Sequence, residues 1–314
     1  MAISGTSEVV VLTRSYSHII GKESILNKAK DNLSVDWRYI VILAVILGLP
    51  AMPVIKDLWQ LWHSDKNFEG LLLVPIMCGI IFYKNRKDFI ECTPRPQKNI
   101  LYFLPLTSGA MLAVSYYDFT RIAGLLLVIN FLIASLGLFG YSKYKLFMIP
   151  LLFLMLMVPP PLRIVDFTIV NLQALFSYLI EPTFLVFSER FIGCHGFEFW
   201  FSGIDYPMII APECSGIRSL MGFIILASFT AILDRHSIFN ISLMIMVGVI
   251  TTLTLNFFRI IITICLRLYG MENYSVGFWH GLLGILMFVI GCTILSNFSF
   301  FLHSDLKQGK IINV

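Results

Sequence analysis

The chain of 314 residues is 57% apolar and only 13% charged, and its mean hydropathy is +0.82. Soluble domains typically contain about 25% charged residues, so this composition excludes a soluble globular protein. The net charge of +4 is too small to indicate nucleic-acid binding. The six cysteines show no CxxC spacing, which argues against a structural zinc site or a disulfide framework. We expect no metal and no other cofactor.

Apolar runs of about 20 residues, each long enough to cross a bilayer as a helix, recur along the chain. They predict an all-α polytopic membrane protein with about eight transmembrane helices. The predicted spans, in chain order, are residues 37–55, 68–83, 100–117, 122–140, 146–159, 212–233, 237–266 and 277–298. The predicted organisation is therefore a cytoplasmic N-terminal segment (1–36), an integral membrane domain (37–300) and a short cytoplasmic tail (301–314).

The distribution of lysine and arginine predicts the orientation, because cytoplasmic loops are enriched in these residues. With the N-terminus inside, 15 of the 23 basic residues fall in inner segments, namely Arg14, Lys22, Lys28, Lys30, Arg38, Lys84, Arg86, Lys87, Arg95, Lys98, Lys143, Lys145, Arg235, Lys307 and Lys310. The bias predicts a plasma (inner) membrane protein with both termini in the cytoplasm.

The stretch between the fifth and sixth spans does not fit a simple transmembrane helix. Residues 166–182, DFTIVNLQALFSYLIEP, predict an amphipathic or shallow helix that ends at Pro182. Residues 197–210, FEFWFSGIDYPMII, alternate large apolar residues around a Ser-Gly turn, which indicates a β-hairpin at the outer surface. Exposed strand edges cannot face lipid, so we expect this hairpin in the interface or packed against the helices.

The sixth span begins with the polar motif PECSGIRSL, residues 212–220. Proline suits a first helical turn, which would place Cys214 beside unpaired N–H groups that favour a reactive thiolate. Arg218, four residues on, would add positive potential, and Glu213 would oppose it. Cys214 could instead be a small buried residue, or form a disulfide with Cys194.

Two later spans carry polar side chains at the same outer boundary. Asn256 and Arg259, in LNFFRIII, share a helix face, and Arg259 either turns into the bundle, held by Asn256, or extends to the headgroups. His280, in GFWHGLLG, starts the last span, where Gly281 and Gly284 permit close helix approach. Its alternative is an ordinary interfacial residue. Together with Cys214, these side chains predict a site with a nucleophile, a cation and a proton carrier at one depth.

The motifs ECSGIRSL (213–220), NFFRI (256–260) and HGLLG (280–284) resemble, in order and spacing, those of the exosortase/archaeosortase family of membrane cysteine transpeptidases and proteases. The resemblance implies that Cys214 is the nucleophile, Arg259 the oxyanion stabiliser and His280 the general acid/base. Arg218, Asn256 and Glu213 would support them. One departure is that Phe68 and Glu69 precede Gly70, where many members have a Ser-His pair.

The resemblance also implies the reaction and the partners. We expect cleavage of C-terminal sorting signals of exported proteins at the outer (periplasmic or exterior) face of the membrane through a thioester acyl-enzyme, with possible transfer to a surface acceptor. The partners would be membrane lipid and secreted proteins that end in a motif, a transmembrane helix and a basic tail, with no nucleic acid.

Two alternatives belong to other functional classes. A transporter or an exopolysaccharide export or assembly component would place polar residues through the bilayer midplane, whereas here they gather at one face. Other intramembrane proteases would need an HExxH motif, paired glutamates or a convincing GxS motif, and the sequence has none of these.

Overall fold

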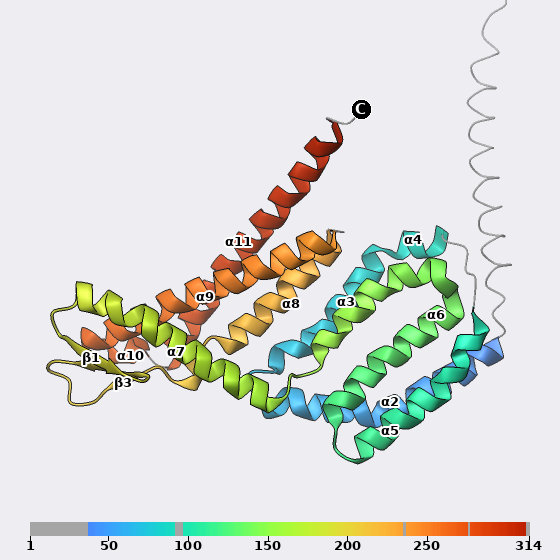
Figure 1. Ribbon diagram of the computed structural model, residues 1–314, viewed down its shortest axis with the longest axis horizontal. Coiled ribbons are helices and arrows are strands. Elements are labelled where there is room, and N and C mark those ends of the chain that lie inside the picture. Colours follow the sequence, from blue (N-terminus) through green and yellow to red (C-terminus); the bar gives the residue numbers. More distant parts are fainter. Residues whose placement is uncertain (1–36, 92–96, 235–236, 276, 312–314) are drawn as a thin grey trace, which may run out of the picture. The chain divides into compact units, whose positions relative to one another are not determined.

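The computed structural model describes residues 37–91, 97–234, 237–275 and 277–311 (Figure 1). The predicted N-terminal segment, 1–36, lies outside these residues. The described chain is helical apart from one small sheet, which confirms the all-α polytopic class. It forms two compact units, one from Met1–Val54 and Asn85–Met148, the other from Ile55–Lys84 and Ile149–Val314.

The described residues of the first unit, 37–54, 85–91 and 97–148, form helices and no strand. This unit contains the start of α2 (Trp37–Ser64), α4 (Arg86–Glu91), η2 (Lys98–Tyr102), α5 (Phe103–Tyr116) and most of α6 (Thr120–Phe153). Leu104 and Ala134 form the buried apolar contact of α5 with α6. Beside it the buried side chain of Asn130 accepts a hydrogen bond of 2.5 Å from the Thr107 hydroxyl, so a polar group between these apolar helices is paired.

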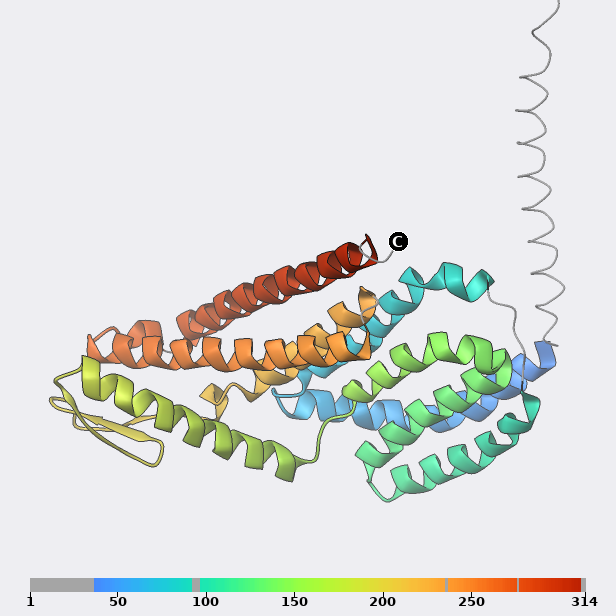
Figure 2. The same cartoon turned by 45° about the horizontal axis from the view of Figure 1, so that its top comes forward.

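The second unit contains the remaining helices and the sheet. Its elements are the end of α2, η1 (Glu69–Leu72), α3 (Leu73–Lys84), the end of α6, η3 (Leu154–Met157), α7 (Leu162–Phe187), β1 (Phe191–His195), β2 (Glu198–Phe201), β3 (Met208–Ile209), η4 (Pro212–Cys214), α8 (Ile217–Leu233), α9 (Ile238–Leu268), α10 (Glu272–Ser275) and α11 (Gly277–Ile311). Figures 1 and 2 show α8, α9 and α11 packed side by side.

The core between α8, α9 and α11 is built from small and large apolar residues. Phe223 and Ala227 of α8 meet Met244 of α9 and Leu295 of α11. A Cβ added to Gly248 of α9 would lie 3.3 Å from the Ala227 Cβ and 3.4 Å from the Phe223 carbonyl oxygen. The two backbones therefore approach as closely as small residues allow, as is common between transmembrane helices.

Seven helices of the described chain are long and apolar enough to cross a membrane, where the sequence predicts eight. They are Ala44–Ser64, Asn99–Tyr116, Thr120–Tyr141, Leu162–Phe187, Pro212–Leu233, Ile238–Leu268 and Gly277–Leu302. Six of them coincide with predicted spans. The predicted span 68–83 instead forms η1 and the 12-residue α3, and the span 146–159 forms the short apolar helix Leu146–Met157.

Three helices extend beyond their predicted ends. α7 passes through Pro182 and ends at Phe187, so the predicted shallow helix is longer than expected. Pro182 has no N–H for the Tyr178 carbonyl, and the helix nevertheless continues; in the next position the Thr183 hydroxyl donates to the Leu179 carbonyl. α2 likewise passes two prolines to reach Ser64, and α11 continues past the predicted end at residue 298 to Ile311.

The sheet confirms the predicted hairpin and adds a strand. β2 and β3 pair antiparallel, with Phe199 opposite Met208, and β1 pairs antiparallel with the other side of β2. The aromatic face packs on α7, where Phe184 and Phe201 meet edge to face at 5.3 Å. The prediction missed β1 because its sequence, FIGCH, is short and contains glycine.

We predict that Gly248→Leu destabilises the α8–α9 contact, because the new side chain has no space beside Ala227. Overpacking of this kind typically costs about 1–3 kcal/mol, so the purified variant should melt at a lower temperature in detergent. Gly79→Leu in α3 is the matched control, because Gly79 is exposed and a Cβ added to it would meet no heavy atom within 4 Å. Equal melting temperatures for the two variants would contradict the proposed packing.

Candidate active site

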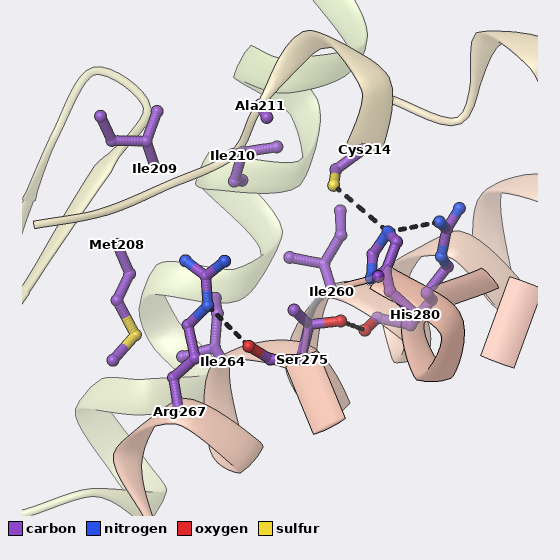
Figure 3. Close-up of a pocket in the computed structure, with 13 residues that line it drawn as sticks. Met208, Ile209, Ile210, Ala211, Cys214, Ile260, Ile264, Arg267, Ser275 and His280 are labelled. Atoms are coloured by element: carbon purple, nitrogen blue, oxygen red, sulfur yellow. Dashed lines mark hydrogen bonds between the residues drawn. The ribbon is translucent and has the colours of Figure 1, made fainter. Parts of the chain in front are cut away.

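A cavity of about 240 Å³ lies at one end of the second unit, where the sheet meets α9 and α11 (Figure 3). Its wall comes from three stretches of the chain, within residues 208–214, 259–267 and 275–280. The lining residues are Met208, Ile209, Ile210, Ala211, Cys214, Arg259, Ile260, Thr263, Ile264, Arg267, Ser275, Gly277 and His280. The structure thus brings Cys214, Arg259 and His280 to one cavity.

Cys214 ends a short turn that precedes α8. The turn η4 is closed by a 2.8 Å hydrogen bond from the Cys214 N–H to the Ala211 carbonyl. Gly216 follows with φ +84° and ψ +5°, a left-handed conformation that an α-helix cannot include, and α8 begins only at Ile217. Cys214 is therefore not in the first turn of the long helix, as the sequence predicts, but on a separate turn before it.

The break at Gly216 also changes the placement of Arg218 and Glu213. Because Cys214 and Arg218 are not on one continuous helix, the expected i, i+4 relation between them does not exist. Arg218 and Glu213 are exposed, and neither lines the cavity.

Asn256 holds the backbone of the cysteine turn. Its Nδ2 atom donates a hydrogen bond of 2.9 Å to the Cys214 carbonyl, and its side chain is only 4% exposed. A Cβ on Gly216 would lie 2.8 Å from both Cγ and Nδ2 of Asn256, so only glycine leaves room for this contact. The sequence predicts that Asn256 holds Arg259, whereas in the structure it positions Cys214.

His280 lies between the thiol and the guanidinium (Figure 3). Its Nε2 atom is 3.8 Å from the Cys214 Sγ and 2.6 Å from Nη2 of Arg259. A guanidinium has only donors, so Nε2 accepts from Arg259 and the proton of the neutral ring is on Nδ1. Nε2 has a single lone pair, so it can act as a base toward the thiol, 3.8 Å away, only after Arg259 has released it.

Arg259 fits because α11 presents a glycine to it. A Cβ on Gly284 would be in ordinary van der Waals contact with Arg259, 3.8 Å from both Cζ and Nη2, so only atoms beyond a Cβ would crowd the guanidinium. Arg259 Nε and His280 Nδ1 are buried and have no hydrogen-bond partner among the described residues. These two N–H donors take part neither in the contact between Arg259 and His280 nor in a contact with Cys214.

The cavity also contains three polar residues that the sequence analysis did not select, Thr263, Arg267 and Ser275. Arg267, near the end of α9, donates through Nε to the Ser275 hydroxyl of α10 at 3.1 Å. Arg259, Thr263 and Arg267 follow each other at intervals of four residues, and residues at this spacing share a helix face. This spacing was the available signal for Arg267, whereas no pattern in the sequence indicates Ser275.

The disulfide alternative is not realised, since Cys194 and Cys214 are both free thiols. Cys194 lies in β1 and contacts the Gly196 carbonyl at 3.4 Å. Burial, together with the nearby Glu181 carboxylate, raises the pKa of the Cys194 thiol, so it is less readily ionised than an ordinary cysteine.

We predict that Gly216→Ala destabilises the protein more than Gly203→Ala. Both glycines have a positive φ, +84° and +83°, so both variants should carry the conformational penalty of about 1–2 kcal/mol. Only Gly216→Ala adds an overlap with Asn256, because Gly203 has nothing within 4 Å.

A double-mutant cycle tests this origin. In the Asn256→Ala variant, adding Gly216→Ala should lower the melting temperature no more than adding Gly203→Ala does. An undiminished loss would show that the contact with Asn256 is not its cause.

The comparisons with known proteins agree with the motifs that meet in this cavity. No curated protein and no solved structure matches the chain. The profile of one family, described as Transmembrane exosortase (Exosortase_EpsH), matches residues 62–296, which include Cys214, Arg259 and His280. This match covers about three quarters of the chain, and the protein therefore belongs to the transmembrane exosortase family.

Proposed function

We propose that the protein is a cysteine transpeptidase or protease that cleaves C-terminal sorting signals of exported proteins at the outer face of the membrane. The observation that carries this proposal is the contact of one imidazole nitrogen, His280 Nε2, with both the Cys214 thiol and the Arg259 guanidinium. A nucleophile beside a base, with the base oriented by a third group, is the arrangement that covalent catalysis requires.

The first step forms a thioester. Arg259 leaves His280 Nε2 and turns its N–H groups to the scissile carbonyl oxygen, His280 Nε2 takes the thiol proton, and the Cys214 sulfur attacks the carbonyl carbon. The carbonyl oxygen becomes an oxyanion that N–H groups of Arg259 stabilise, an interaction often worth about 3–4 kcal/mol in the transition state. When the tetrahedral species collapses, the C–N bond breaks and His280 returns its proton to the leaving amine.

The second step releases the product. An amine of a surface acceptor, or water, gives a proton to His280 Nε2 and attacks the thioester carbonyl. The C–S bond breaks and the proton returns to the thiolate, so the enzyme is regenerated with no net change. The supporting role of Asn256 is to hold the Cys214 carbonyl, and thus the turn from which the sulfur attacks.

One wall of the cavity suits an extended peptide. Residues 208–211 line it, and β3 is the last strand in the order β1-β2-β3. After β3 the Ile210 N–H donates to the Phe197 carbonyl, and the Gln173 side chain donates to the Ile210 carbonyl. Within the described chain no further strand lies beside the outer edge of β3. A substrate in extended conformation could pair with this edge, as peptides do on other sheet edges.

The charges of the second unit support the proposed orientation. At the ends of α3 and α8 away from the cavity, Asp234 lies 3.6 Å from Lys84 and accepts a 2.7 Å hydrogen bond from Ser299. Lys84 ends α3 and is followed in the sequence by Arg86 and Lys87, a basic cluster that the positive-inside rule assigns to the cytoplasm. The cavity end then faces the exterior or periplasm, where sorting signals of secreted proteins emerge.

The transporter alternative has less support. In the membrane helices of the second unit, Ser228 and Thr252 hydrogen-bond to carbonyls of their own helices, Ile224 and Gly248. These polar groups are paired within their own helices and do not line the cavity.

Replacement of Cys214 by alanine should abolish processing while the protein still accumulates in the membrane. The assay is cleavage of a co-expressed secreted protein from the same genome that ends in a motif, a transmembrane helix and a basic tail. Cys292→Ala, a cysteine of α11 that does not line the cavity, is the matched control and should process normally. Retained processing by Cys214→Ala would exclude it as the nucleophile.

Substitution should distinguish the roles of His280 and Arg259, the two partners of Cys214. His280→Ala removes the base and should lower the rate about 10²–10⁴-fold, whereas Arg259→Ala removes the oxyanion donor and should lower it about 10²–10³-fold. Single-turnover assays should then show no thioester in His280→Ala. Near-normal rates in either variant would contradict the assigned role.

A further inference from the structure

The described lining of the cavity carries positive charge without a matching negative charge. It includes the guanidinium groups of Arg259 and Arg267, and none of its 13 described residues is aspartate or glutamate. Buried charges are costly unless they are paired or hydrated. The cavity is therefore complementary to an anionic ligand.

The two arginines are not equivalent. Arg259 contacts His280 and belongs to the proposed catalytic group. Among the residues that the structure describes, the hydrogen bond of Arg267 is the one from Nε to Ser275, at 3.1 Å. In Figure 3 its terminal nitrogens point away from Ser275 into the space beneath Ile210.

This arrangement suits recognition of a carboxylate. A guanidinium has five N–H donors, and the bond to Ser275 uses the one on Nε, which leaves the planar terminal pair of nitrogens. Such a pair binds a carboxylate through two parallel hydrogen bonds. The bond to Ser275 orients the group in advance, so less side-chain freedom is lost on binding.

The position of Arg267 on α9 determines which residue of a bound peptide it can contact. It lies eight residues beyond Arg259, which is about 12 Å along a helix. An extended peptide covers this distance in about three or four residues. On the proposed orientation α9 runs outward, so the peptide beside Arg267 precedes the scissile bond, whereas the substrate's own membrane helix follows it.

We infer that Arg267 is a specificity-determining residue that binds an aspartate or glutamate side chain of the substrate, about three residues before the bond attacked by Cys214. This inference rests on the proposed function. The competing roles for Arg267 are a structural one, in which it serves only the negative end of α9, and the binding of a lipid phosphate.

A reporter library tests the assignment. A secreted reporter is followed by six randomised residues, an apolar transmembrane helix and a basic tail, and is co-expressed with the full chain. The genes of processed reporters are then sequenced for the wild type, Arg267→Gln, Arg267→Glu and Cys214→Ala. Arg190→Glu is the matched control, because Arg190 is an exposed cation of the same unit that does not line the cavity.

The wild type and Arg190→Glu should enrich Asp or Glu at least tenfold at one position. Arg267→Gln should lose that enrichment, and Arg267→Glu should replace it by Lys or Arg. The enrichment is a ratio within one variant, so it does not depend on how much enzyme accumulates.

Other results would contradict the assignment of Arg267. An unchanged acidic preference in Arg267→Gln, or a wild type without any acidic preference, would overturn the assignment while Cys214-dependent cleavage remains. A uniform loss of cleavage across all reporters would indicate the lipid or structural role instead. If no reporter is processed in a Cys214-dependent way, the proposed function itself fails, and the assignment fails with it.

Discussion

The hydrogen bond from Asn256 to the Cys214 carbonyl is the interaction on which the site depends. Cys214 lies on a short turn outside α8, so the long helix does not fix the direction of its side chain. Asn256 connects this turn to α9, the helix that also carries Arg259. The left-handed Gly216 lets the amide approach. A single buried side chain thus fixes the position of the nucleophile relative to the helix that carries the cation.

The membrane requires that these polar residues be held together at one end of the second unit. Within a bilayer an unpaired polar group is expensive, so an apolar protein gains by concentrating its polar chemistry at one boundary. Arg259, Thr263 and Arg267 form a polar stripe along the last turns of α9, and the apolar Ile260 and Ile264 beside it complete the wall. Residues of β3 and Ser275 of α10 complete the lining at the same end.

The sequence was sufficient for the class of protein and for the three side chains that meet in the cavity. Hydropathy indicated the long helices, because an uncharged apolar run of 18 or more residues is typical of a transmembrane helix, at about 1.5 Å of rise per residue. Cys214, Arg259 and His280 were predicted at one depth from the orientation of their helices. Their contacts, in contrast, depend on tertiary packing, and neither the 3.8 Å approach of thiol to imidazole nor the bond of Asn256 to Cys214 follows from spacing.

The prediction that failed at Cys214 shows why local rules are insufficient there. The motif PECSGIRSL has the residues of a helix start, and the i, i+4 rule would pair Cys214 with Arg218. That rule assumes continuous helical backbone, and Gly216 interrupts it with φ +84°. Glycine is unfavourable inside a helix but costs little in a left-handed turn. Because of this interruption Cys214 is not part of α8, and its thiol lies beside His280. The residue that interrupts the helix therefore also permits the arrangement of the site.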